Sequence, residues 1–74
     1  MPKTVSGKRC IKILTQNFGF FIASQRGSHV KLRRYVGTTT ITTIVPRHSE
    51  LAHGTLRGIL ELGNVPFTDF ENYM

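Results

Sequence analysis

The first part of the chain has apolar residues at helical spacing, with polar residues on the other faces. The apolar positions stand at i, i+3 and i+7: Ile11, Leu14 and Phe18. Ser6 precedes them and is a favourable N-cap residue, while Gly19 follows them and can adopt the left-handed conformation that ends a helix. The pattern therefore predicts an amphipathic helix over about residues 7–17.

Three segments of strand character follow this helix. Residues 20–25 are rich in aromatic and β-branched types and end at a turn over residues 26–28. From His29 onward, apolar and cationic residues alternate, which is typical of a half-buried strand, and here its polar face is cationic. After a second turn at Gly37, residues 38–45 have the β-branched density of a third strand, which the following proline stops.

A second helix is expected after a polar loop over residues 47–53. Its apolar positions are Leu56, Ile59 and Leu60, and Gly63 stands where a C-terminal cap is expected. Residues 67–74 are compatible with one or two more helical turns, with Phe67 and Phe70 on the same side.

The order helix, three-stranded antiparallel sheet, helix predicts an α+β fold. Each helix has one apolar stripe and the sheet has one apolar face, so the simplest packing lays both helices on the same face. The opposite face then stays open. On this interpretation the open face carries the polar residues of the second strand, which are His29, Lys31 and Arg33. Arg26 and Arg34 are expected near the edges of this face.

Length and charge restrict the function further. Seventy-four residues make a single domain over 1–74, too small for most large-pocket enzymes. Residues 1–48 hold nine Lys and Arg and no Asp or Glu, whereas residues 49–74 hold one Arg and four acids. Positive charge confined to one part of the chain is typical of a protein that contacts phosphates. One cysteine and the lack of an apolar stretch near the roughly 20 residues of a membrane span predict a soluble, cytoplasmic protein without a disulfide.

His29 is the candidate catalytic residue. An imidazole exchanges protons near neutral pH, and cations beside it would stabilise the negative charge that grows on a phosphodiester under attack. The alternative is an ordinary polar strand residue that follows a turn. The cations Lys8 and Lys12 on the first helix would extend contact with a nucleic-acid backbone, or they form a solvated helix face.

The other histidines, His48 and His53, either bind phosphate and support a site or are ordinary solvated loop residues. A zinc site would have to combine Cys10, His29, His48 and His53, whose spacings match no common pattern, so no metal or cofactor is expected. Cys10 is expected in the core. Tyr35 either stacks on a base or, the commoner use, closes the edge of the core.

Five segments in order resemble the HicA toxins, also called the YcfA-like family. The similarity covers about residues 6–70, and its motifs are Ser6-Gly7-Lys8, Asn17-Phe18-Gly19-Phe20, Gln25-Arg26-Gly27-Ser28-His29, Val45-Pro46-Arg47-His48 and Gly54-Thr55-Leu56-Arg57-Gly58-Ile59-Leu60. The resemblance implies a fold like a double-stranded-RNA-binding domain. It also implies an mRNA interferase of a type II toxin–antitoxin system, with a HicB-type antitoxin that covers the active surface.

The resemblance also implies roles for individual residues. The catalytic histidine of the family lies in a G-[ST]-H motif, which is Gly27-Ser28-His29 here. Family members often have a second histidine next, where this chain has Val30, and the loop before the second helix is shorter here, which leaves the role of His48 open.

Together, the residues and the resemblance predict a metal-independent endoribonuclease that acts on single-stranded mRNA. RNA supplies its own nucleophile, the 2′-hydroxyl, so the enzyme has only to position the strand, transfer protons and stabilise charge. His29 would transfer protons as general acid or base. The expected RNA-binding residues are Lys8, Lys12, Arg26, Ser28, Lys31 and Arg33. Two alternatives use the same basic surface without chemistry: a non-catalytic RNA-binding module, and an interaction protein that binds an acidic partner.

Overall fold

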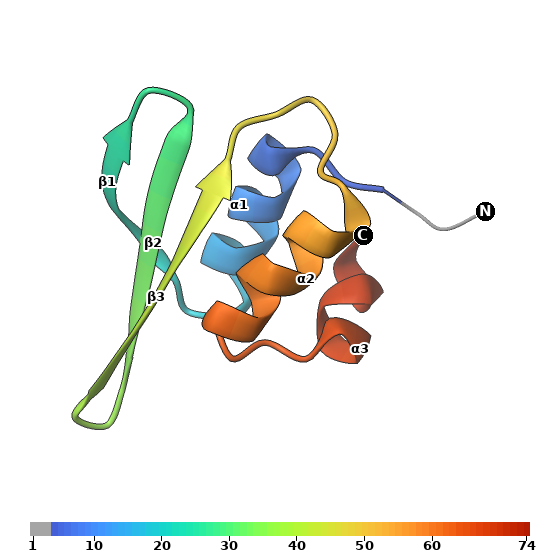
Figure 1. The fold of residues 1–74 in the computed structure, drawn as a ribbon. Helices are drawn as coiled ribbons and strands as arrows, with labels where there is room; N and C mark the ends of the chain where they lie inside the picture. Colours follow the sequence, from blue (N-terminus) through green and yellow to red (C-terminus); the bar gives the residue numbers. More distant parts are fainter. Residues whose placement is uncertain (1–3) are drawn as a thin grey trace.

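A computed structural model of the chain describes residues 4–74 (Figure 1). The elements are α1 Gly7–Asn17, β1 Phe21–Arg26, β2 His29–Val36, β3 Thr39–Pro46, α2 His53–Leu62, α3 Phe67–Phe70 and the 3-10 helix η1 Glu71–Tyr73. The predicted order of helix, three strands and helix is confirmed. The last segment forms α3 and η1, in line with the extra turns expected there.

The three strands form one antiparallel sheet in the order β1-β2-β3. Both α1 and α2 lie on the same side of this sheet, and no element within residues 4–74 covers the other side (Figure 1). The predicted α+β architecture with an open face is therefore confirmed. The far end of the β2–β3 hairpin extends beyond the helices, so residues near it are exposed on both faces.

Helix α1 begins and ends as its sequence predicts. The Ser6 hydroxyl accepts a hydrogen bond from the Arg9 backbone N–H at 3.0 Å, which satisfies one of the free donors of the first turn. Gly19, just beyond the helix, has φ +75°. This conformation costs glycine little and explains why the chain turns there into β1.

The start of α1 lies directly against the end of β3. A Cβ atom on Gly7 would collide with the carbonyl oxygen of Pro46 and would lie 2.8 Å from the Cα of Arg47. The Gly7 N–H donates a hydrogen bond to the His48 carbonyl at 2.9 Å. Gly7 is therefore required for the close approach of two backbones, not for its conformational freedom.

The core lies between the helices and the covered face of the sheet. Val30 and Leu32 of β2 are buried there together with Cys10 of α1, as expected for that cysteine. Burial raises the pKa of the Cys10 thiol to about 12. The one buried polar side chain among the described residues is Thr43, whose hydroxyl donates to the Ile59 carbonyl at 2.8 Å and so ties β3 to α2.

The prediction that Arg34 lies near the edge of the open face is wrong. Its guanidinium lies on the helix side and donates to three carbonyls, those of Phe18 (3.1 Å), Gly63 (2.9 Å) and Asn64 (3.0 Å). It also stands 4.9 Å from the centre of the Phe20 ring, while its buried Nε has no hydrogen-bond partner among the described residues. Arg34 therefore joins the ends of α1 and α2 to the sheet.

Candidate nucleic-acid interface

The β1–β2 turn holds His29 at the first position of β2. Gly27 has φ +58°, a conformation in which other residues are strained, and the Gln25 side-chain amide donates to the Gly27 carbonyl at 3.2 Å. The Arg47 backbone N–H donates to the Ser28 carbonyl at 2.7 Å. The turn is therefore fixed both within itself and against the segment that follows β3.

An open depression of about 550 Å³ lies beside this turn. Its lining residues come from all three strands: Ser24, Gln25, Arg26, His29, Lys31 and Ile44. The strand register explains the grouping, because Arg26 pairs with His29 across β1 and β2, and Lys31 pairs with Ser24 on one side and with Ile44 on the other. We call this set the His29 groove.

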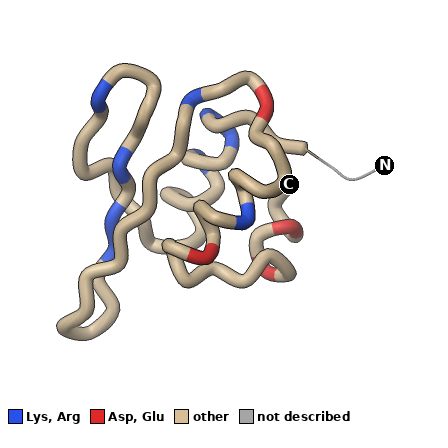
Figure 2. The backbone as a smooth tube through the Cα atoms, viewed as in Figure 1, with Lys and Arg blue, Asp and Glu red and all other residues tan. Residues whose placement is uncertain are grey.

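The His29 groove is cationic. Figure 2 shows Lys and Arg along β1 and β2, while Asp and Glu lie on the loop after β3 and on the helical side. Residues 1–48 contain no Asp or Glu, so no strand supplies an acid to this face. An exposed imidazole between Arg26 and Lys31 is suited to bind a phosphodiester and to exchange a proton with it.

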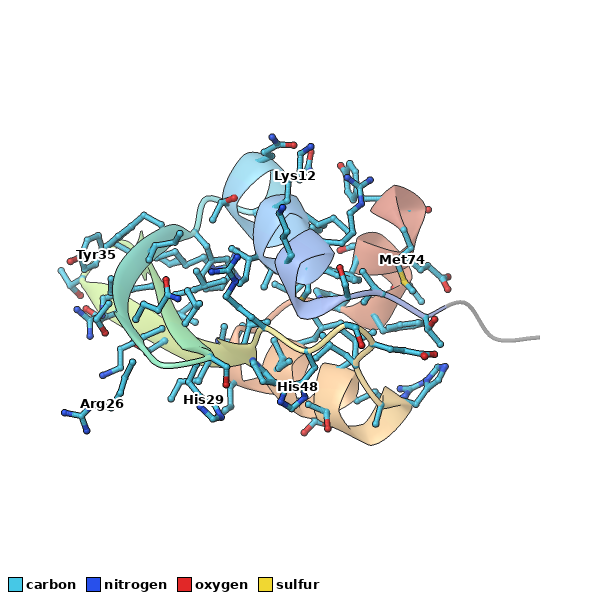
Figure 3. All side chains as sticks on the ribbon, turned by 90° about the horizontal axis from the view of Figure 1, so that it is seen from above. Lys12, Arg26, His29, Tyr35, His48 and Met74 are labelled. Atoms are coloured by element: carbon cyan, nitrogen blue, oxygen red, sulfur yellow. The ribbon has the colours of Figure 1, made fainter. Side chains whose placement is uncertain are left out.

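The other predicted RNA-binding residues lie at different distances from the groove. Arg33 is further along the same face of β2, where its Nε donates to the Thr42 hydroxyl at 3.4 Å, and Ser28 is exposed in the turn. Lys8 lines a second, smaller groove between α1 and β1 that also includes Gln25 and Arg47. Lys12 is a residue of α1, and its side chain lies well apart from Arg26 and His29 (Figure 3). The structure thus brings Arg26, Ser28 and Lys31 to His29 but does not bring Lys12 there.

Several residues of these two grooves were not predicted from the sequence. Ser24 and Ile44 flank Lys31 in the His29 groove, and Gln25 lines both grooves. The signal that was available is the antiparallel register, since a tight turn at Gly27 places the residues before it opposite those after it. The position of Arg47 in the second groove depends on how the loop after β3 folds back on the β1–β2 turn, which the sequence does not indicate.

The other two histidines occupy different places. His48 follows β3, and Figure 3 shows its ring on the same side of the molecule as His29. His53 begins α2, where its ring lies 6.4 Å from that of Phe67. In residues 4–74, no three His, Cys, Asp or Glu side chains come together as a possible metal site.

No helix within residues 4–74 is both long enough and apolar enough to cross a bilayer.

Comparison with known proteins agrees with the motifs. A family model described as "HicA toxin of bacterial toxin-antitoxin" matches residues 7–63, which include α1, the whole sheet and α2. No curated protein matches the chain. The match spans well over half of the sequence and contains the β1–β2 turn and the His29 groove, so the chain belongs to the HicA toxin family of bacterial toxin–antitoxin systems.

Proposed function

We propose that this toxin is an endoribonuclease that cleaves mRNA and that His29 is its catalytic residue. The observation that carries the proposal is the placement of an exposed histidine in an open groove between Arg26 and Lys31. The groove is not an enclosed cavity and lies on the uncovered face of the sheet, which suits a polymer strand better than a small enclosed substrate. The family to which the chain belongs supports a toxic activity but does not by itself assign the chemistry.

The reaction uses groups that RNA and the His29 groove supply. The 2′-hydroxyl oxygen attacks the adjacent phosphorus and loses its proton to a base, and the bond from phosphorus to the 5′-oxygen breaks as that oxygen gains a proton. The products are a 2′,3′-cyclic phosphate and a 5′-hydroxyl end. His29 acts in one of these two proton transfers, while Arg26 and Lys31 stabilise the charge on the phosphoryl oxygens. No step requires a metal ion.

A HicB-type antitoxin is the proposed partner. The open face of the sheet carries the groove and has cations without acids, so a partner with acidic residues would be attracted to it. Occupying the groove would exclude RNA without any change in the fold. Slower acylation of the Lys31 side-chain amine in the complex than in the free chain would test this placement.

The decisive experiment replaces His29. Purified chain and His29→Ala are incubated with single-stranded RNA in the presence of a chelator, and cleavage is followed by gel electrophoresis. We expect the substitution to slow cleavage about 10²- to 10⁴-fold, the usual contribution of general acid–base catalysis, while RNA binding is retained. His53→Ala is the matched control because it removes another exposed histidine, at the start of α2.

Two results would contradict the proposal. Intact RNA after incubation with the unmodified chain, together with salt-dependent RNA binding, would identify a non-catalytic binding module. Undiminished cleavage by His29→Ala would remove the histidine from the mechanism. End-group analysis adds an independent check, because 5′-phosphate products would exclude attack by the 2′-hydroxyl.

A further inference from the structure

Two aromatic rings lie together on the open face of the sheet, outside the His29 groove. Phe21 of β1 and Tyr35 of β2 have ring centroids 5.6 Å apart with 41° between the ring planes. Phe21 is 41% exposed and Tyr35 is 65% exposed. Tyr35 therefore does not close the edge of the core, which was the commoner expectation for it, and neither ring is among the buried core residues.

A cation accompanies the two rings. Phe21 pairs with Arg33 across β1 and β2, and Tyr35 follows Arg33 by two residues on β2, so all three side chains are on one face. On the same face, Lys31 stands between Arg33 and His29. A continuous row of cations therefore leads from the His29 groove to the rings, and β1, β2 and β3 contain no acid.

We propose that Phe21, Arg33 and Tyr35 form a base-stacking subsite for single-stranded RNA, a proposal that rests on RNA being the substrate. Proteins that bind single strands combine cations that follow the backbone with exposed aromatic rings on which bases stack. Tyr35 is six residues from His29 along β2, about 20 Å at the usual strand rise. The subsite thus binds nucleotides some distance from the cleaved bond and favours longer RNA over short fragments.

Binding is measured on a His29→Ala background, so that RNA stays intact. Fluorescence anisotropy with a labelled single strand, within the roughly 4–16 nucleotides typical of such sites, compares Tyr35→Ala, Phe21→Ala and Tyr35→Phe. Each alanine substitution is expected to weaken binding about 5- to 150-fold, the effect of losing one stacked base, whereas Tyr35→Phe keeps the ring and binds nearly as well. Tyr73→Ala is the control, since Tyr73 is also exposed but lies in η1 next to Met74, and Met74 is at the opposite end of the molecule from Tyr35 (Figure 3).

Cleavage assays with His29 present separate this subsite from catalysis. Tyr35→Ala is expected to raise KM for a long RNA with little change in kcat, and to leave cleavage of a dinucleotide unchanged because a dinucleotide cannot reach the rings. If the chain binds RNA through Tyr35 but does not cleave it, the subsite stands and the proposed catalysis fails.

Unchanged RNA affinity in both Tyr35→Ala and Phe21→Ala would overturn the subsite even if cleavage is observed. Loss of antitoxin binding alone in these variants would instead assign the rings to a protein interface and would equally overturn the proposal. If Phe21→Ala lowers the melting temperature, the RNA affinity of Tyr35→Ala alone tests the subsite, because Tyr35 is the more exposed of the two residues.

Discussion

Arg33 and Arg34 are consecutive residues of β2, and their guanidinium groups lie on opposite faces of the sheet. Arg33 lies on the open face beside Thr42, while Arg34 lies on the helix side and donates hydrogen bonds to three carbonyls. Two neighbouring residues of the same type therefore have separate roles. Arg34 stabilises the fold, and Arg33 belongs to the surface that we propose binds RNA.

Substitution of the two arginines should separate stability from RNA binding. Arg34→Met leaves the carbonyls of Phe18, Gly63 and Asn64 without their donor, and the free energy of unfolding is expected to fall by about 2 kcal/mol or more. Arg33→Met is expected to change stability by only about 0.5 kcal/mol and to weaken RNA binding. Urea unfolding and RNA titration of both variants check this, and equal loss of stability in both would contradict it.

Gly7 and Gly58 provide a matched pair of helical glycines. Gly7→Ala forces apart α1 and the end of β3, since its Cβ has no space beside Pro46, and we expect a loss of about 2–4 kcal/mol or failure to fold. Gly58→Ala meets no atom within 4 Å and should instead stabilise α2 by up to about 1 kcal/mol. Thermal melting of both variants tests the difference. A stable Gly7→Ala with native spectra would show that the two backbones can separate at little cost.

Lys31 and Lys12 differ in their distance from His29. Lys31 lines the His29 groove, whereas Lys12 lies over α1. Lys31→Gln is therefore expected to weaken RNA binding and to reduce the slope of log affinity against log salt by about 0.7, one phosphate contact on a single strand. Lys12→Gln should have a smaller effect on both. A larger loss with Lys12→Gln would mean that RNA runs mainly over α1.

The raised pKa of the buried Cys10 thiol is expected to make the fold less stable at high pH. Its thiol has a pKa of about 12 in the folded chain against 9.0 in a solvated one, so above pH 9 the unfolded chain releases a proton that the folded chain keeps. Between these values the free energy of unfolding falls as pH rises, by up to about 1.4 kcal/mol per pH unit. Urea unfolding at about pH 8 and about pH 10 should show a steeper fall for the natural chain than for Cys10→Ala. Equal slopes would contradict this assignment.

The sequence predicted the elements well because their signals are local. The helix over residues 7–17, the turns at Gly27 and Gly37 and the alternation in β2 each depend on neighbouring residues. Arg34 was misplaced because its partners Phe18 and Gly63 lie 16 and 29 residues away along the chain. Gly63 is the C-cap of α2, as expected, but the residue with the left-handed conformation is Asn64. Gly63 instead allows close packing, because a Cβ there would lie 3.1 Å from the Phe20 ring.

The candidate site was predictable only in part for the same reason. His29, Arg26 and Lys31 share a short hairpin, so their proximity follows from the turn. The contribution of Ile44 depends on the register of β3, and that of Arg47 depends on a loop that returns to the turn. These contacts join segments that no local pattern connects.

The backbone contacts around the β1–β2 turn have a consequence for inhibition. Arg47 is hydrogen-bonded to Ser28, and the next residue, His48, is hydrogen-bonded to Gly7. The β1–β2 turn is therefore connected through this segment to the N-terminus of α1. Such a preorganised site loses little entropy when a ligand docks. If the His29 groove binds RNA as we propose, the β1–β2 turn needs no prior ordering, so a protein that covers the groove would be sufficient to prevent RNA binding.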